Sequence, residues 1–149
     1  MTELPETTAR SRPENLAILL REPFRIGSER LAERFAERGH GEVRAAHGNV
    51  LQYLDDRGTR VSVLAQRAQI TKQSMAELVA HLERHGYVER VPDPEDGRAK
   101  LVRATRKGGE VYAIAREFVA ELEARWTARL GEEKMRRLRE LLVELNEQL

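Results

Sequence analysis

Apolar residues recur every three or four positions over most of the chain, which is the spacing of helices with one buried face. The first such stretch spans residues 16–38, and we expect Pro23 to kink it or to begin a new turn there. A second stretch spans residues 43–56, after a break that contains Gly39 and Gly41. The pattern therefore predicts two helices in the first third of the chain.

Residues 61–105 form the stretch around which the rest of the chain is organised. A short helix is expected at residues 63–68, where Ser62 is placed to cap it. A tight connection leads to a second helix, which begins at Thr71 and stops at Gly86. Two helices joined by a tight turn are the first half of a known DNA-reading layout.

Two extended runs follow, at residues 87–91 and 100–104, joined by a charged tip that contains two prolines and a glycine. Helix, turn, helix and hairpin together are the layout of a winged helix-turn-helix, which places its second helix in a DNA major groove. The fold class expected is mainly α, with a small β-hairpin wing and a helical dimerisation region supplied by both termini.

The C-terminal third predicts a long helix with Thr105 as its N-cap and a break at Gly131. The segment after the break carries an apolar stripe at alternating steps of three and four. This stripe can pack against the chain's own helices or against a second copy, and its place at a terminus favours a dimer. The residues expected at the dimer interface are Leu16, Leu19, Leu20, Leu138, Leu142, Leu145 and Leu149.

These patterns divide the chain into four regions. Residues 1–15 show no apolar periodicity and are expected to form a flexible tail. Residues 16–56 are expected to supply N-terminal helices for dimerisation and support. Residues 57–104 form the DNA-binding lobe, and residues 105–149 form the C-terminal dimerisation helices.

Composition narrows the function classes. Charged residues make up 34% of the 149 residues and aromatic residues 5%, which favours a helical protein over a sheet protein. The chain has no cysteine, so disulfides and thiolate metal sites are excluded. No apolar run approaches the ~20 residues that a membrane span needs, and we expect a cytoplasmic protein. Residues 57–107 carry eleven Lys/Arg against six Asp/Glu, which is typical of a DNA-binding segment, although a solvated surface can have the same balance.

The start of the second helix carries the chemistry for reading DNA. Lys72 can bond guanine O6 and N7, and Gln73 can pair with adenine N6 and N7. Thr71 and Ser74 can bond phosphate, helped by the helix N-terminus, and the small Ala76 permits close approach to the groove. On an isolated helix these residues indicate only an exposed helix start, so the interpretation depends on the surrounding layout.

The hairpin tip gives a second signal. Arg98 is suited to a narrow minor groove, whose negative potential attracts arginine. Asp96 can hold the loop or orient Arg98. Arg90, Lys100 and Arg103 lie along the strands, where they can meet phosphates. The alternative is a charged, solvated turn, which the preceding helix-turn-helix disfavours.

The chain resembles the MarR family, the multiple antibiotic resistance regulators, in detail over residues 50–112. The motifs that carry the resemblance are Thr71-Lys-Gln-Ser74, Leu82-Glu-Arg-His-Gly-Tyr-Val-Glu-Arg90, Asp93-Pro-Glu-Asp-Gly-Arg98 and Thr105-Arg-Lys-Gly108. The resemblance implies a homodimer whose terminal helices interlock and whose two winged lobes bind a pseudo-palindromic operator. It also implies a transcriptional regulator, usually a repressor released by a small molecule.

The resemblance also implies roles for individual residues. Those that match the family's DNA contacts are Lys72, Gln73, Ser74, Asp96 and Arg98. Glu77 departs from the family pattern, in which many relatives carry a basic or small residue at this place. It can accept a hydrogen bond from cytosine N4, or it can point away from DNA.

Metal and catalytic sites find little support in the sequence. His81 and His85 have a chelating i, i+4 spacing, but the glutamate that a metalloprotease helix needs directly after the first histidine is replaced by Leu82. We expect His85 near a helix C-terminus and His81 facing solvent or DNA. No nucleotide-binding or hydrolase motif is present, so neither an enzyme nor a cofactor is expected.

No motif locates an effector pocket. The family resemblance implies one between the dimer helices and the winged lobe, for a small aromatic or anionic molecule. On that basis the pocket candidates are Phe24, Phe35, His47, Leu51 and Tyr53, although residues of these types are more often ordinary core. Two other functions stay open, a winged helix that docks a protein partner and a regulator that responds to no effector.

Overall fold

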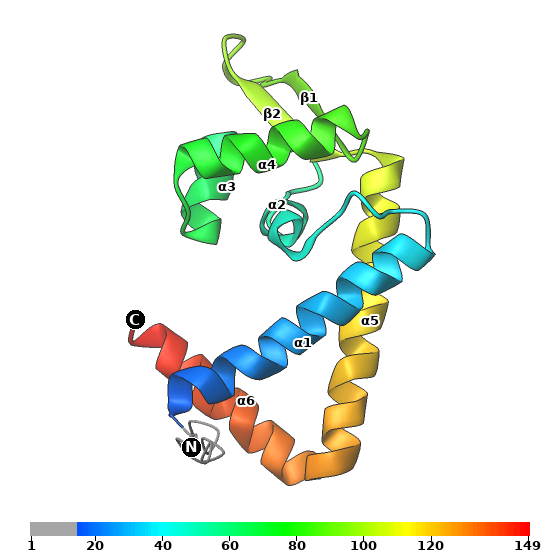
Figure 1. The fold of residues 1–149 in the computed structure, drawn as a ribbon. Coiled ribbons are helices and arrows are strands. Elements are labelled where there is room, and N and C mark those ends of the chain that lie inside the picture. Colours follow the sequence, from blue (N-terminus) through cyan, green and yellow to red (C-terminus); the bar gives the residue numbers. More distant parts are fainter. Residues whose placement is uncertain (1–14) are drawn as a thin grey trace, which may run out of the picture.

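The computed structural model describes residues 15–149, in which three long helices form a scaffold and a small lobe sits at one end of it (Figure 1). Helix α5 runs from the lobe to the far end of the scaffold, where the chain turns into α6 (Figure 1). No helix in this part of the chain is long and apolar enough to cross a membrane. The scaffold helices are α1 (Leu16–Glu37), α5 (Arg106–Leu130) and α6 (Glu132–Glu147).

The lobe contains the expected helix-turn-helix. Helix α3 (Val61–Ala68) ends at Gln69, whose left-handed conformation (φ 54°) makes the tight turn. Helix α4 (Lys72–Arg84) then begins at Thr71, as predicted, because the Thr71 side chain accepts the Ser74 N–H at 3.1 Å. The cap expected at Ser62 is wrong: α3 begins two residues earlier than expected, at Val61, and Arg60 at its cap position makes no side-chain cap bond.

The expected hairpin is also present. Strands β1 (Val88–Pro92) and β2 (Lys100–Ala104) pair antiparallel, with Arg90 opposite Val102. An isolated bridge between Thr59 and Val102 joins the segment before α3 to the far side of β2. The hairpin is therefore tied to the front of the helix-turn-helix by backbone hydrogen bonds as well as by packing.

The helix predicted at residues 43–56 is much shorter in the structure. It consists of a single 3₁₀ turn, η1 (Ala45–His47), followed by α2 (Gly48–Leu51). After α2, a tight turn takes over the polar groups: the Asp55 N–H donates to Thr59 Oγ1 at 2.9 Å, and Gly58 N–H donates to Asp55 O at 2.9 Å. These local bonds compete with helix formation, and they explain why the apolar spacing alone overestimated its length.

Helix α1 continues through Pro23 to Glu37. The new turn that was one of the two expectations for Pro23 is therefore wrong. Pro23 is exposed, so the one backbone donor that it lacks leaves no buried group unpaired. Further along α1, the buried Gly27 lets the helix approach α5, where an added Cβ would lie 3.2 Å from Leu122.

The core belongs to the lobe and to the first half of α5. Its fully buried side chains come from every lobe element, and the Tyr87 ring lies at the centre of the junction with α5. The largest members are Val50, Leu64, Met75, Val79, Leu82, Tyr87, Val88, Val102 and Val111. In contrast, α6 has no buried residue, and α1 buries only two.

Two adjacent glycines at the start of α5 generate the first prediction. A Cβ on Gly108 would lie 2.1 Å from the carbonyl oxygen of Tyr87, which is backbone and cannot move aside, whereas a Cβ on Gly109 would meet nothing within 4 Å. We expect Gly108→Ala to lower the free energy of unfolding by about 2 kcal/mol or more. Gly109→Ala, the matched control, should raise it by about 0.5–1 kcal/mol because alanine favours the helix. Urea unfolding followed by circular dichroism measures both, and equal effects would contradict this packing.

Candidate nucleic-acid interface

Helix α4 presents one side to the core and the opposite side to solvent. Met75, Val79 and Leu82 are fully buried. Gln73 and Glu77, which lie on the other side of the helix, are exposed. The helix therefore offers its polar face outward along its first two turns, as a helix that enters a groove must.

The first turn of α4 combines free and engaged groups. Lys72 is exposed and forms no ion pair with any residue that the structure describes. The Thr71 hydroxyl, in contrast, donates to Ser74 Oγ at 2.8 Å and accepts the Ser74 N–H. Gln73 Nε2 donates to Glu77 Oε1 at 3.5 Å, a long contact. Lys72 and Gln73 are thus available outward, while Thr71 and Ser74 already stabilise the helix start.

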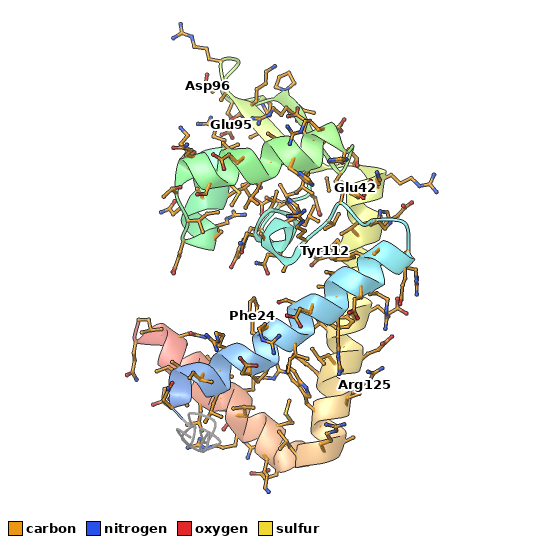
Figure 2. All side chains as sticks on the ribbon, in the orientation of Figure 1. Phe24, Glu42, Glu95, Asp96, Tyr112 and Arg125 are labelled. Atoms are coloured by element: carbon orange, nitrogen blue, oxygen red, sulfur yellow. The ribbon has the colours of Figure 1, made fainter. Side chains whose placement is uncertain are left out.

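The wing tip separates the roles of Asp96 and Arg98. The backbone N–H of Arg98 donates to Asp96 Oδ1 at 3.1 Å, so Asp96 holds the turn rather than the guanidinium. The Arg98 side chain is exposed and forms no ion pair within residues 15–149. Figure 2 shows Asp96 at the end of the hairpin, well beyond the body of the lobe. The tip therefore presents a free arginine on a turn that is fixed by its aspartate.

The base of the wing is fixed by a pair that the sequence did not reveal. Arg60, directly before α3, donates from Nε to Asp93 Oδ2 at 2.7 Å, and its Nη2 lies 2.6 Å from the same oxygen. Asp93 is buried, and its Oδ1 accepts the Glu95 N–H at 2.9 Å. That backbone bond, followed by the Arg60 contact, holds the pKa of Asp93 below its ordinary value. Asp93 was indistinguishable in the sequence from the other acids of the tip because its partner lies 33 positions away.

The basic residues along the strands differ in how free they are. Arg90 Nε pairs with Glu83 at 3.1 Å, and Arg103 Nε pairs with Glu89 at 2.7 Å. Lys100 is exposed and has no such partner in the described part of the chain. Exposed pairs of this kind contribute little to stability and can be exchanged for a phosphate. Lys100 is therefore free to contact a phosphate, whereas Arg90 can do so only after its ion pair with Glu83 is broken.

Comparison with known proteins agrees with this geometry. Residues 43–99, from the turn before α2 to the wing tip, match the model of the MarR family. The matched residues are those of the helix-turn-helix and the wing, so this region of the chain is similar to the DNA-binding lobe of that family. Transcriptional regulator HosA of Escherichia coli O111:H- is 33% identical over 81 residues, which are 54% of this chain and 60% of HosA. The matches span only 33% to 60% of the length of the curated relatives.

Solved structures extend the likeness to the scaffold. The S. aureus MepR–DNA complex has a TM-score of 0.76 at 19% identity, over 92% of this chain and 100% of MepR. The PcaV regulator of Streptomyces coelicolor, solved with its natural ligand, has a TM-score of 0.69 at 22% identity, over 99% of this chain and 98% of PcaV. At these identities the two likenesses establish a MarR-type fold for lobe and scaffold together.

All four histidines of this MarR-type chain lie at the junction between lobe and scaffold. His47 and His81 stack with ring centroids 4.3 Å apart, and His85 follows 4.6 Å from His81. His81 Nε2 donates to the carbonyl oxygen of Glu42 at 2.9 Å. The expectation that His81 faces solvent or DNA is therefore wrong, because its ring is half-buried against η1. Within the described residues, no group of three potential ligands is placed to hold a metal ion.

A buried hydroxyl completes this junction. The Tyr87 hydroxyl donates to Glu42 Oε2 at 2.9 Å, and His40 Nδ1 lies 3.1 Å from the same hydroxyl oxygen. Burial, with the Glu42 carboxylate second, raises the pKa of Tyr87 to about 12. The Lys107 ammonium sits 4.3 Å from the centre of the Tyr87 ring. The loop after α1, the lobe and the start of α5 thus meet around the neutral phenol of Tyr87.

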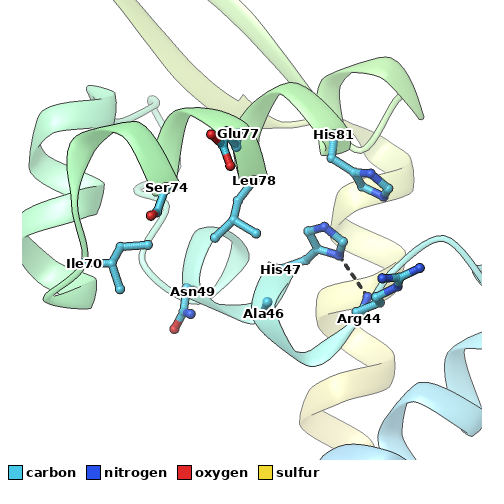
Figure 3. Close-up of a pocket in the computed structure, with 9 residues that line it drawn as sticks. All are labelled: Arg44, Ala46, His47, Asn49, Ile70, Ser74, Glu77, Leu78 and His81. Carbon is cyan, nitrogen blue, oxygen red and sulfur yellow. Dashed lines mark hydrogen bonds between the residues drawn. The ribbon is translucent and has the colours of Figure 1, made fainter.

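The expected effector residues are not gathered in one place. His47 lines a cleft of about 520 Å³ between η1, α2 and α4, shown in Figure 3. Leu51 lines a second cleft of about 310 Å³ between the end of α2 and the start of α5. Phe35 is core, Tyr53 packs at its edge, and Phe24 is 73% exposed on α1 (Figure 2). In this chain the five residues line two separate clefts, the core and an open helix face.

The buried His47 ring predicts an acid-sensitive lobe. Burial, then the neighbouring His81, lowers the pKa of His47 to about 4 from 6.5, so the folded state favours its neutral form. The unfolded chain takes up the proton near pH 6.5, so this contribution to stability is complete above pH 6.5 and is lost as the pH falls toward 4. We expect the free energy of unfolding to fall by about 1–2 kcal/mol between pH 7 and pH 5 through this residue.

Urea unfolding at the two pH values measures this effect, with His47→Gln as the test variant. The variant should lose most of the pH-dependent difference, because glutamine does not take up a proton in this range. Glutamine also keeps a polar group near the Arg44 N–H, which donates to His47 Nδ1 at 2.9 Å. His85→Gln, which removes the half-buried histidine next to His81, is the matched control and should keep the difference. An unchanged pH dependence in His47→Gln would contradict the assignment.

Proposed function

We propose that this protein is a MarR-type transcriptional regulator that binds double-stranded DNA as a homodimer in the cytoplasm. The observation that carries the proposal is the distribution of free and paired charges on the lobe. Lys72, Lys100 and Arg98 form no ion pair with the residues described, and all three are exposed. Acids nearby are held by arginines, as Asp93 is by Arg60. The exposed cations are therefore available for phosphates and base edges.

The two contact elements reach different parts of a duplex. The outward face of α4, with Lys72 and Gln73, is suited to the major groove, where a helix fits and where both side chains can bond base edges. The wing tip, which Asp96 holds in shape, is suited to the adjacent minor groove through Arg98. MepR, which shares the fold, has been solved in complex with DNA. We infer the same mode of binding for this chain.

The dimer is proposed from the scaffold. Leu16, Leu19 and Leu20 on α1 are 40–65% exposed, and Leu138 and Leu145 on α6 are each 41% exposed. Helix α6 buries none of its residues within one chain, so its apolar stripe needs another surface. A second copy supplies a matching stripe on a two-fold axis. Two lobes on one scaffold would then read two half-sites of a pseudo-palindromic operator.

We also propose that a small molecule regulates this protein by releasing it from its operator. PcaV, with the same fold, has been solved with its natural ligand. The two clefts of this lobe border α2 and the start of α5, which connect the lobe to the scaffold. A small aromatic or anionic effector bound at that connection would change the angle between the two parts and thereby release the operator from a repressor. His47 and Leu51 are the residues expected to contact it.

Arg98→Ala tests the wing. We expect DNA affinity to fall by about 1–3 kcal/mol, because the guanidinium is lost without any folded contact being broken. Arg125→Ala removes the same charge at the far end of α5 (Figure 2) and is the matched control. Gel-shift titrations at two salt concentrations measure both variants. If Arg98→Ala and Arg125→Ala bind DNA equally well, or if the affinity of the wild type does not depend on salt, the result would point to a protein-docking module in place of a DNA reader.

Glutamates introduced into the apolar stripe of α6 test the proposed dimer. Leu138→Glu combined with Leu145→Glu should give a monomer, because two carboxylates in the same apolar seam cannot be buried without partners. Val143→Glu is the matched control: it also exchanges an apolar residue of α6, 52% exposed, for a glutamate, but outside the stripe. Sedimentation equilibrium measures the mass of each variant. A wild-type monomer at micromolar concentration would overturn this part of the proposal.

A further inference from the structure

Glu77 occupies the most outward position of α4. It follows Met75 by two residues and precedes Val79 by two, and both of those side chains are fully buried. At 100° per residue, Glu77 therefore points about 160° away from each of them. Its neighbours Ala76 and Ala80 are small, and the exposed Glu77 side chain also borders the cleft that His47 lines. Any duplex that receives α4 meets Glu77 near the centre of the contact.

The Glu77 carboxylate has no cation to neutralise it. No lysine, arginine or histidine nitrogen lies within 4.0 Å of it in residues 15–149, and its one hydrogen bond comes from Gln73 Nε2 at 3.5 Å. Four other acids of the lobe are paired: Asp55 with Arg67, Glu83 with Arg90, Glu89 with Arg103 and Asp93 with Arg60. An acid left unpaired at this position repels phosphates, so it weakens binding to DNA in general.

We propose that Glu77 is a specificity-determining residue that selects cytosine in each half-site of the operator. The proposal rests on the proposed DNA binding. A carboxylate only accepts hydrogen bonds, and in the major groove guanine and thymine present acceptors at O6, N7 and O4. Adenine offers its N6 amine beside the acceptor N7, whereas cytosine offers its N4 amine without an adjacent acceptor. Glu77 therefore gains a donor partner at cytosine, meets only acceptors at guanine and thymine, and at adenine finds a donor whose neighbour N7 repels it.

Gln73 sets the base read next to it. Its amide donates one N–H toward Glu77, which orients the group and leaves a second N–H and the carbonyl oxygen facing outward. That pairing of donor and acceptor matches adenine N7 and N6. The two residues are one helical turn apart, a rise of roughly 6 Å, or about two base-pair steps. The operator half-site is thus expected to carry an adenine and a cytosine at that separation.

Selection from random duplex DNA with the full-length chain tests the inference. The wild type should enrich cytosine over the other bases by about 5- to 150-fold at one position of each half-site. Glu77→Gln keeps the size of the side chain but adds a donor, so the preference at that position should move to adenine. Glu77→Ala should abolish the preference there and leave the rest of the half-site unchanged. Glu77 is exposed, and thermal unfolding should show both variants to be folded.

Glu110→Gln is the matched control, since it removes the same charge from an exposed position on α5 and should select the wild-type sequence. If Glu77→Gln and Glu77→Ala both select the wild-type sequence, Glu77 reads no base and the inference is overturned. If the wild type itself enriches no sequence, the proposed DNA-reading function fails instead. A preference that moves to adenine in Glu77→Gln and disappears in Glu77→Ala, while Glu110→Gln selects the wild-type sequence, supports both the DNA-reading function and the role of Glu77.

Discussion

The burial of Tyr87 is the constraint on which the joint between lobe and scaffold depends. Its N–H donates to Leu82 O at 2.8 Å where α4 ends, and its carbonyl accepts the Thr105 N–H at 3.1 Å where α5 begins. Its hydroxyl reaches Glu42 in the loop from α1. Three segments distant in sequence therefore converge on one residue at the start of β1. The absence of a side chain at Gly108 is what allows α5 to come so close to it.

Electrostatics divide the lobe into a fixed part and a free part. The ion pair of Arg60 with Asp93 holds the base of the wing, and the pairs on the strands cover much of the remaining charge. The groups left without partners in the described chain, among them Lys72, Arg98 and Glu77, lie on the outward face of α4 and at the wing tip. The structural pairs and the proposed recognition groups are thus separate sets, so substitutions in the second set should leave the fold unchanged.

How much the sequence could predict follows from the range of the interactions involved. The cap predicted at Thr105 and the helix start predicted at Thr71 both depend on residues within one turn, and both are confirmed. The fold class is confirmed as well, because turn chemistry and apolar spacing agree throughout the lobe. The prediction of a helix at residues 43–56 was wrong, since apolar spacing does not register the Asp55–Thr59 turn.

The site was less accessible to sequence reasoning than the fold. The wing anchor and the position of His81 depend on contacts across 33 and 39 residues, for which no local signal exists. The DNA-contact, effector and dimer-interface residues stay predictions, because each concerns a partner molecule. Spacing along α4 did place Lys72 and Gln73 on the side away from the core, since helical periodicity relates them to Met75 and Val79.

The double attachment of the wing has a mechanical consequence. The wing is held to the front of α3 by the Arg60–Asp93 pair and by the Thr59–Val102 backbone bridge, so we expect α3, α4 and the hairpin to move together. A small rotation at the Tyr87 joint would carry the helix and the distant wing tip along arcs of different length. The fit of α4 to the major groove and of the wing tip to the minor groove would then be lost together. Such a lobe would release DNA in one step, because its contacts could not loosen one by one.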